Sequence, residues 1–230
     1  MWWVALLVGV SSIIGWDASP AQEPAGAAGA RVSGRITILE KDNKPTTDLG
    51  DAVVYLEGPR STARPTAIEI AINDKTFVPR VLVVPLGATV RFTNRDPFNH
   101  NVFSASDPNS FDLGLYGRGE ARSWTFTAPG LVRVYCNIHP RMVAFVQVMA
   151  TRHFRQPSAD GSFALENVPP GQYKLHVWHE RSPEVVQEVT VSAAGVTGLE
   201  VRLDARGFRW QSHKNKYGRD YPTSAGRERY

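Results

Sequence analysis

Short runs in which apolar and polar residues alternate account for almost all of the chain from residue 31 onward. Within 88–94, Ala88, Val90 and Phe92 fall on one face of an extended chain, and two threonines and an arginine fall on the other. A repeat of two is typical of a strand with one buried face. The same alternation recurs in 131–136, and no stretch shows a convincing helical repeat. The pattern therefore predicts an all-β protein.

The predicted strands fall into three groups. The first covers 31–40 and 52–57, with a polar turn between them, and the third contains two strands within 160–177, followed by 185–191 and 199–203. The central group has strands predicted at 67–72, 81–84, 88–94, 101–103, 123–127, 131–136 and 143–150, and a long loop at 104–119. Roughly seven or eight strands in a region of this size are typical of a β-sandwich or barrel.

The two flanking groups are each too thin to fold alone. Four strands after residue 150 would bury little apolar surface, and small domains are marginal for that reason. We therefore predict one β-sandwich made of residues 31–60 plus 151–205, with a second domain of residues 66–150 inserted between its halves. A plain tandem arrangement is the alternative.

The N-terminal segment predicts export. Residues 2–16 are apolar apart from two serines, and small residues follow as far as Ala21. The run is shorter than the about 20 residues that span a membrane, so residues 1–21 are interpreted as a signal peptide and residues 22–30 as a flexible linker. No basic residue precedes Arg31, which leaves an uncleaved membrane anchor or a buried helix as alternatives. The predicted location is the periplasm.

The positive charge of the chain is concentrated at its C-terminal end. The formal net charge is +4, but residues 206–230 alone contain seven Lys or Arg and two Asp or Glu. The rest of the chain is near neutral, which argues against a nucleic-acid partner, because that function needs a basic face on a folded module. The basic tail, 206–230, also carries aromatic residues. It is predicted to be a solvated extension or to contact an acidic partner or anionic lipid headgroups.

The only cysteine, Cys136, is followed at intervals of three residues by His139 and Met142. A thiolate, a thioether and two imidazoles are the ligand set of a type 1 copper site, and His100 offers the second imidazole. Taken singly, each of these side chains would be an ordinary core or surface residue, so the prediction of one copper ion depends on their combination. Zinc is the weaker alternative, because structural zinc sites use several cysteines and no methionine.

Two asparagines directly follow ligand residues. Asn101 comes after His100 and Asn137 after Cys136, and both are predicted to support the ligands through side-chain or backbone hydrogen bonds. His139 is expected to lie near the surface, where its ring edge would pass electrons to a partner.

Other candidates receive more ordinary interpretations. Phe92, Phe103 and Trp124 are predicted to exclude water from the site. His176 and His179 invite a second metal site, but residues three apart on a strand point to opposite faces. They are therefore interpreted as strand-end histidines.

Residues of about 66 to 150 resemble the cupredoxins, the group of plastocyanin and amicyanin. The resemblance is carried by the segments 77–79 (FVP), 84–90 (VPLGATV), 94–96 (NRD), 100–102 (HNV), 128–130 (APG) and 135–142 (YCNIHPRM). The Cys-x-x-His-x-x-Met spacing is similar to the short ligand loop of amicyanin. The resemblance implies a Greek-key β-sandwich with His100, Cys136, His139 and Met142 as copper ligands. Asn137 departs from the residue often found after the cysteine.

The flanking strands resemble a carboxypeptidase regulatory-like (transthyretin-like) β-sandwich, through segments 161–177 and 52–56. That resemblance implies a module without catalysis. The whole chain is predicted to be a periplasmic copper protein that carries single electrons between redox partners such as a cytochrome or a dehydrogenase, and not an enzyme. A copper enzyme that resembles this fold would place histidines on both sides of the cysteine, whereas Cys136 lies between Tyr135 and Asn137. A module that binds or stores copper, or a structural interaction module, is the alternative.

Overall fold

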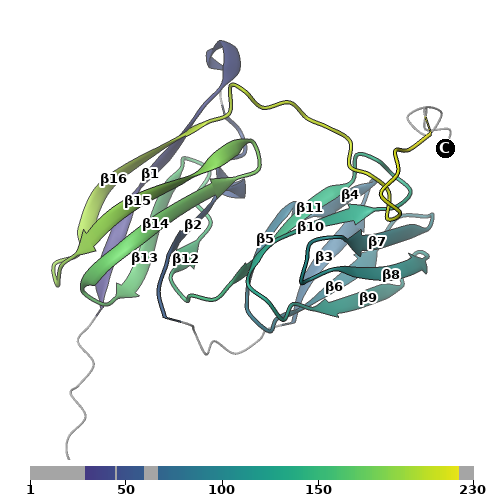
Figure 1. Ribbon diagram of the computed structural model, residues 1–230, viewed down its shortest axis with the longest axis horizontal. Coiled ribbons are helices and arrows are strands. Elements are labelled where there is room, and N and C mark those ends of the chain that lie inside the picture. The colour runs from purple at the N-terminus through teal and green to yellow at the C-terminus, as the bar shows by residue number, and fades with distance from the viewer. Residues whose placement is uncertain (1–28, 45, 60–66, 223–230) are drawn as a thin grey trace, which may run out of the picture.

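The computed structural model describes residues 29–44, 46–59 and 67–222. Within these ranges the chain forms sixteen β-strands in four sheets and two short 3-10 turns, as Figure 1 shows. The prediction of an all-β protein is confirmed. The predicted signal peptide and nearly all of the predicted linker lie outside the described residues. Within the described ranges, no helix is long and apolar enough to cross a membrane.

The central part of the chain folds into two sheets that enclose one apolar core. The first sheet has the order β5 (Val81–Pro85), β11 (Val143–Met149), β10 (Gly130–Cys136), β7 (His100–Ser104), β8 (Phe111–Tyr116), and the second has the order β4 (Thr76–Val78), β3 (Ala67–Asn73), β6 (Thr89–Asn94), β9 (Ala121–Thr125). Phe92 and Phe126 are fully buried between the sheets, each with its ring centroid 6.1 Å from that of Phe111.

Strand β8 corrects the prediction of a loop over 104–119. Its two ends, Phe111 and Tyr116, are both buried although they are five residues apart, so the strand does not keep a strict repeat of two. The irregularity has a structural cause, because the pairing of β8 with β7 shifts register between Asn101 and Phe103 and Gly114 adopts a positive φ of 73°. A β-bulge of this kind hides the strand from a search for alternation.

The second sandwich is assembled from both ends of the chain. One sheet has the order β13 (Ser162–Val168), β1 (Ala30–Leu39), β16 (Val196–Asp204), and the other has the order β12 (Phe154–Arg155), β2 (Val53–Leu56), β14 (Gly171–His179), β15 (Ser182–Val191). The strands that precede the central domain therefore pair in both sheets with strands that follow it. The likeness of this sandwich to the carboxypeptidase regulatory-like fold stays a prediction.

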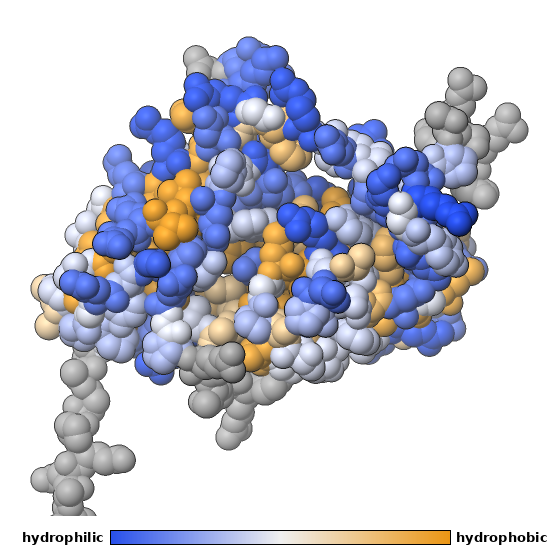
Figure 2. Space-filling view, in the orientation of Figure 1, coloured by the Kyte–Doolittle hydropathy of each residue, from blue (hydrophilic) through white to orange (hydrophobic). Residues whose placement is uncertain are grey.

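The two sandwiches pack directly on each other. Val53 of the second sandwich shares a small buried cluster with Val81 and Phe145 of the central domain. Beside this cluster Arg80 holds the carboxylate of Glu180 with two guanidinium nitrogens, the shorter contact being 2.7 Å. Figure 2 shows apolar residues exposed along this junction. The inserted domain is thus held against the second sandwich by packing and an ion pair, in addition to the two segments of chain that connect them.

Candidate metal centre

Two neighbouring strands carry the two ligand candidates that are far apart in the sequence. His100 begins β7 and Cys136 ends β10, and these antiparallel strands pair Cys136 with Val102. The pairing brings the start of one strand beside the end of the other. His139 and Met142 lie in the loop between β10 and β11, which is closed by hydrogen bonds from Met142 N to His139 O (3.1 Å) and from Cys136 N to Met142 O (3.3 Å).

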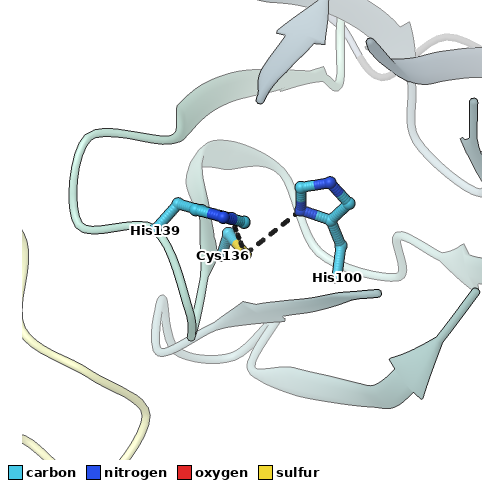
Figure 3. Close-up of side chains that lie close together, drawn as sticks. All are labelled: His100, Cys136 and His139. Carbon is cyan, nitrogen blue, oxygen red and sulfur yellow. Dashed lines mark hydrogen bonds between the residues drawn. The ribbon is translucent and has the colours of Figure 1, made fainter. Parts of the chain in front are cut away.

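Three of the predicted ligands converge in the interior. The sulfur of Cys136 lies 3.6 Å from Nδ1 of His100 and 3.6 Å from Nδ1 of His139, as Figure 3 shows. His100 and Cys136 are 0% exposed, His139 is 7% exposed, and Met142 at the end of the loop is 2% exposed. The prediction that a distant histidine meets the cysteine is therefore correct.

The orientation of His100 is set by a buried carboxylate that sequence reasoning missed. Its Nε2 lies 2.9 Å from Oδ2 of Asp96. Because an ionised carboxylate only accepts hydrogen bonds, Nε2 carries the proton and the lone pair of Nδ1 faces Cys136. Burial lowers the pKa of His100, although Asp96 opposes this effect, so the imidazole is neutral at pH 7 and can bind a metal.

Asp96 is itself held by the backbone of the turn between β3 and β4. The amides of Asp74 and Lys75 donate to its two carboxylate oxygens at 2.6 and 2.9 Å. Burial acts to raise the pKa of Asp96, but the hydrogen bonds from Lys75, His100 and Asp74 outweigh it and hold this pKa below its usual value. The carboxylate is therefore ionised when it orients the imidazole.

The thiol of Cys136 is protonated in the metal-free protein at neutral pH. Burial raises its pKa, and the backbone amides of Ile138, Asn101 and His139 act in the opposite direction. The amide of Ile138 lies 3.5 Å from the sulfur. A metal that binds here must displace the thiol proton, and the same amides then stabilise the thiolate.

Asn101 and Asn137 are joined to each other by one backbone hydrogen bond. The amide of Asn137 donates to the carbonyl of Asn101 at 3.1 Å, which joins the ligand loop to β7. Their side chains point elsewhere: Nδ2 of Asn101 donates to Asp112 at 2.6 Å, and Oδ1 of Asn137 accepts from the amide of Lys216 at 2.9 Å. Any support that these side chains give the ligands is therefore indirect.

The aromatic surroundings differ in part from those predicted. Phe98, which sequence reasoning did not single out, packs against both ligand imidazoles, with ring centroids 5.3 Å from His100 and 5.8 Å from His139. Phe103 instead packs against Tyr135, the residue before the cysteine. His139 is more buried than expected, although of the two ligand imidazoles it is the one with residual exposure.

The donor set fits one soft metal ion. The Cys136 sulfur and the two Nδ1 atoms all lie within 4.8 Å of one another. Metal–sulfur and metal–nitrogen bonds of about 2.3 and 2.0 Å together exceed the observed 3.6 Å, so a single ion can reach all three atoms. One thiolate and two imidazoles suit copper better than a structural zinc site, which prefers more cysteines.

The other histidine pair does not converge. His176 stacks on Tyr55 and lies 3.0 Å from Glu57, whereas His179 lies 3.6 Å from Asp48. Among the described residues, the only group of three potential His, Cys, Asp or Glu ligands that meets is the one around Cys136.

Comparison with known proteins identifies a family for the central domain. Residues 65–149 match the family model for copper binding proteins of the plastocyanin/azurin family. No curated protein sequence matches the chain. Similar solved structures include a purple cupredoxin from Nitrosopumilus maritimus (26% identity, 36% of this chain and 99% of that chain, TM-score 0.33) and the Cu(I) form of an amicyanin variant (24%, 42% and 98%, TM-score 0.35). A third is a Cu-containing nitrite reductase from Thermus scotoductus SA-01 (25%, 50% of this chain but 28% of that chain, TM-score 0.36).

The family match and the convergence of the ligand atoms concern the same part of the chain. The matched range contains both sheets of the central sandwich and all four predicted ligands. Residues 65–149 are therefore a cupredoxin domain of the plastocyanin/azurin family, and its type 1 copper site is formed by His100, Cys136, His139 and Met142.

Proposed function

We propose that the protein is a periplasmic electron carrier that exchanges single electrons with protein partners through one type 1 copper ion. The observation that carries the proposal is the pair of 3.6 Å contacts between the Cys136 sulfur and the Nδ1 atoms of His100 and His139 in an enclosed site. Copper bound by such ligands supplies a one-electron couple. A copper ion held by these buried side chains would be able to change its oxidation state.

The chain contributes rigidity. His100 and Cys136 belong to paired strands, and the loop that carries His139 is closed by its own backbone hydrogen bonds. Ligands held in this way move little when an electron arrives, which keeps electron transfer fast. The buried site also excludes water, because Phe98 packs against both imidazoles.

Two exposed apolar side chains lie near the ligand strands. Ile138, in the ligand loop, is 38% exposed, and Leu115, which pairs with Asn101 across β7 and β8, is 57% exposed. Exposed apolar groups favour transient protein contacts. They support docking of a redox protein, such as a cytochrome or a dehydrogenase, at this end of the domain.

Copper storage without electron transfer is the second candidate. It is less well supported, because a single thiolate with two imidazoles binds both common oxidation states of copper, whereas soft thiolates alone favour Cu(I). A copper enzyme of the nitrite reductase kind would need further metal ligands. The neighbours of Cys136 are Tyr135 and Asn137, neither of which is a histidine.

The test starts from the protein lacking residues 1–21, to which one equivalent of Cu(II) is added. We expect an intense blue colour that disappears on reduction, a reversible one-electron wave in voltammetry, and electron transfer to a cytochrome in stopped-flow mixing. Cys136→Ser is the control and should lose the colour while keeping its far-ultraviolet circular dichroism. A colourless protein that retains only Cu(I) would favour storage instead.

A further inference from the structure

The basic C-terminal tail lies on the cupredoxin domain over the part that the structure describes. After β16 ends at Asp204, the chain leaves the second sandwich and crosses to the far end of the central domain, where it passes close to β7 and β10 (Figure 1). The crossing segment is mostly hydrophilic (Figure 2). Three polar contacts then join it to β10, to the ligand loop and to β8.

These contacts involve the backbone around the cysteine ligand. The hydroxyl of Tyr221 donates to the carbonyl of Cys136 at 2.9 Å. The amide of Lys216 donates to Oδ1 of Asn137 at 2.9 Å, and its Nζ lies 2.7 Å from Oδ2 of Asp112. The tail therefore binds the last residue of β10, the first residue of the ligand loop and the neighbouring strand β8.

Two ring contacts reinforce the polar ones. The imidazole of His213 stacks on the ring of Tyr135 with a centroid separation of 4.3 Å and an interplanar angle of 21°. It also meets the ring of Tyr221 edge-on at 5.4 Å. Tyr135 directly precedes Cys136, so the tail contacts the residues on both sides of the cysteine.

The tail has a defined turn where it makes these contacts. Oδ1 of Asn215 accepts from the amides of Tyr217 and Arg219, both at 3.0 Å, and the amide of Asn215 donates to the carbonyl of Arg219 at 2.8 Å. Gly218 has a φ of 74°, which glycine adopts without strain. The turn is held by its own hydrogen bonds, so less chain entropy is lost when it binds the domain.

We propose that residues 213–221 are a clamp that holds the copper-ligand loop in its metal-binding geometry. His213, Lys216 and Tyr221 are its positioning residues: they touch the backbone and the side chains next to Cys136 and do not touch the metal. The clamp limits local opening of the loop, which keeps the buried thiol from solvent in the metal-free protein and keeps the ligands fixed when copper is bound. The clamp itself is inferred from these contacts, and only its benefit for electron transfer rests on the proposed function.

The first test uses the metal-free full-length chain and measures the rate at which iodoacetamide alkylates Cys136. This rate reports local opening, since the thiol is fully buried in the closed state. Loss of one hydrogen bond in Tyr221→Phe should raise the rate about two- to tenfold. Adding His213→Ala should raise it further. Tyr173→Phe is the matched control, because its hydroxyl also donates to a backbone carbonyl at 2.9 Å, that of Pro169, but in the second sandwich, and it should leave the rate unchanged.

The second measurement is the rate of copper loss to a chelator from the loaded protein, which should rise in the same order among the variants. Equal alkylation rates in the wild type, Tyr221→Phe, the double variant and Tyr173→Phe would overturn the clamp. If the alkylation rates rose as expected but the protein formed no blue copper centre, the clamp would stand and the proposed function alone would be contradicted. The two proposals can therefore fail separately.

Discussion

Substitution of Asp96 by asparagine tests how the copper site is oriented before any metal binds. The carboxylate is 5% exposed and accepts hydrogen bonds from the amides of Asp74 and Lys75 and from Nε2 of His100. An asparagine amide has one acceptor oxygen in place of two. Its NH2 group would therefore face at least one of these three donors.

The expected magnitude follows from these contacts. A hydrogen bond to a charged group contributes about 1.5–3 kcal/mol, and a buried donor left without an acceptor has a comparable cost. If the bond to His100 is the one weakened, Nδ1 is no longer held as the free acceptor facing Cys136. We expect the copper affinity to fall about ten- to a hundredfold. The metal-free protein should lose about 2 kcal/mol of unfolding free energy.

The assay is a competition titration against a chelator of known copper affinity, with urea unfolding of the metal-free protein alongside. Glu69→Gln is the matched control: it removes one carboxylate charge from the same domain, but from an exposed pair with Arg95 at 2.7 Å. We expect it to change the affinity less than about twofold, since exposed ion pairs contribute little. If Asp96→Asn bound copper as tightly as this control, the argument that the carboxylate fixes the imidazole would be refuted.

Three further predictions concern Met142, pH and the domain junction. Met142→Leu should keep copper but raise its reduction potential, as measured by voltammetry, because a weakly bound thioether ligand would tune the potential; an unchanged potential would count against ligation. Burial lowers the pKa of the His179 imidazole in the folded protein. The stability that the neutral imidazole contributes should therefore be fully present above its unfolded-state pKa of about 6.5 and be lost as the pH falls below that value. Between pH 7.5 and pH 5.5, the unfolding free energy measured in urea should fall less for His179→Gln than for the wild type. An equal fall in both proteins would contradict the role given to His179. Arg80→Met should lower the unfolding free energy by about 1 kcal/mol after allowance for solvent screening of its pair with Glu180, whereas Arg31→Met, in a more exposed pair, should have no measurable effect.

The copper ligands were predictable from the sequence because their chemistry is distinctive. Cys136 is the only cysteine of the chain, and a histidine and a methionine follow it at intervals of three residues, which is the donor set that copper prefers. Asp96 had a weaker signal in the sequence, namely its place two residues after Asn94 and four before His100. In the structure its amide donates to Oδ1 of Asn94 at 2.9 Å, which holds the turn that carries the carboxylate. Phe98 had none, because one aromatic residue in a loop is not distinctive.

The alternation of apolar and polar residues by itself determined that the protein is all-β and where most strands lie, because burial of one strand face is recorded locally. The tertiary structure alone decided that the paired ends of β7 and β10 bring His100 to Cys136, since strand pairing joins segments with no sequence relation. It also decided where the tail lies. Two of the tail's contacts each join a side chain to a backbone group, the amide of Lys216 and the carbonyl of Cys136. Nearly every residue carries such backbone groups, so the pattern of side chains along the sequence does not show where these contacts form.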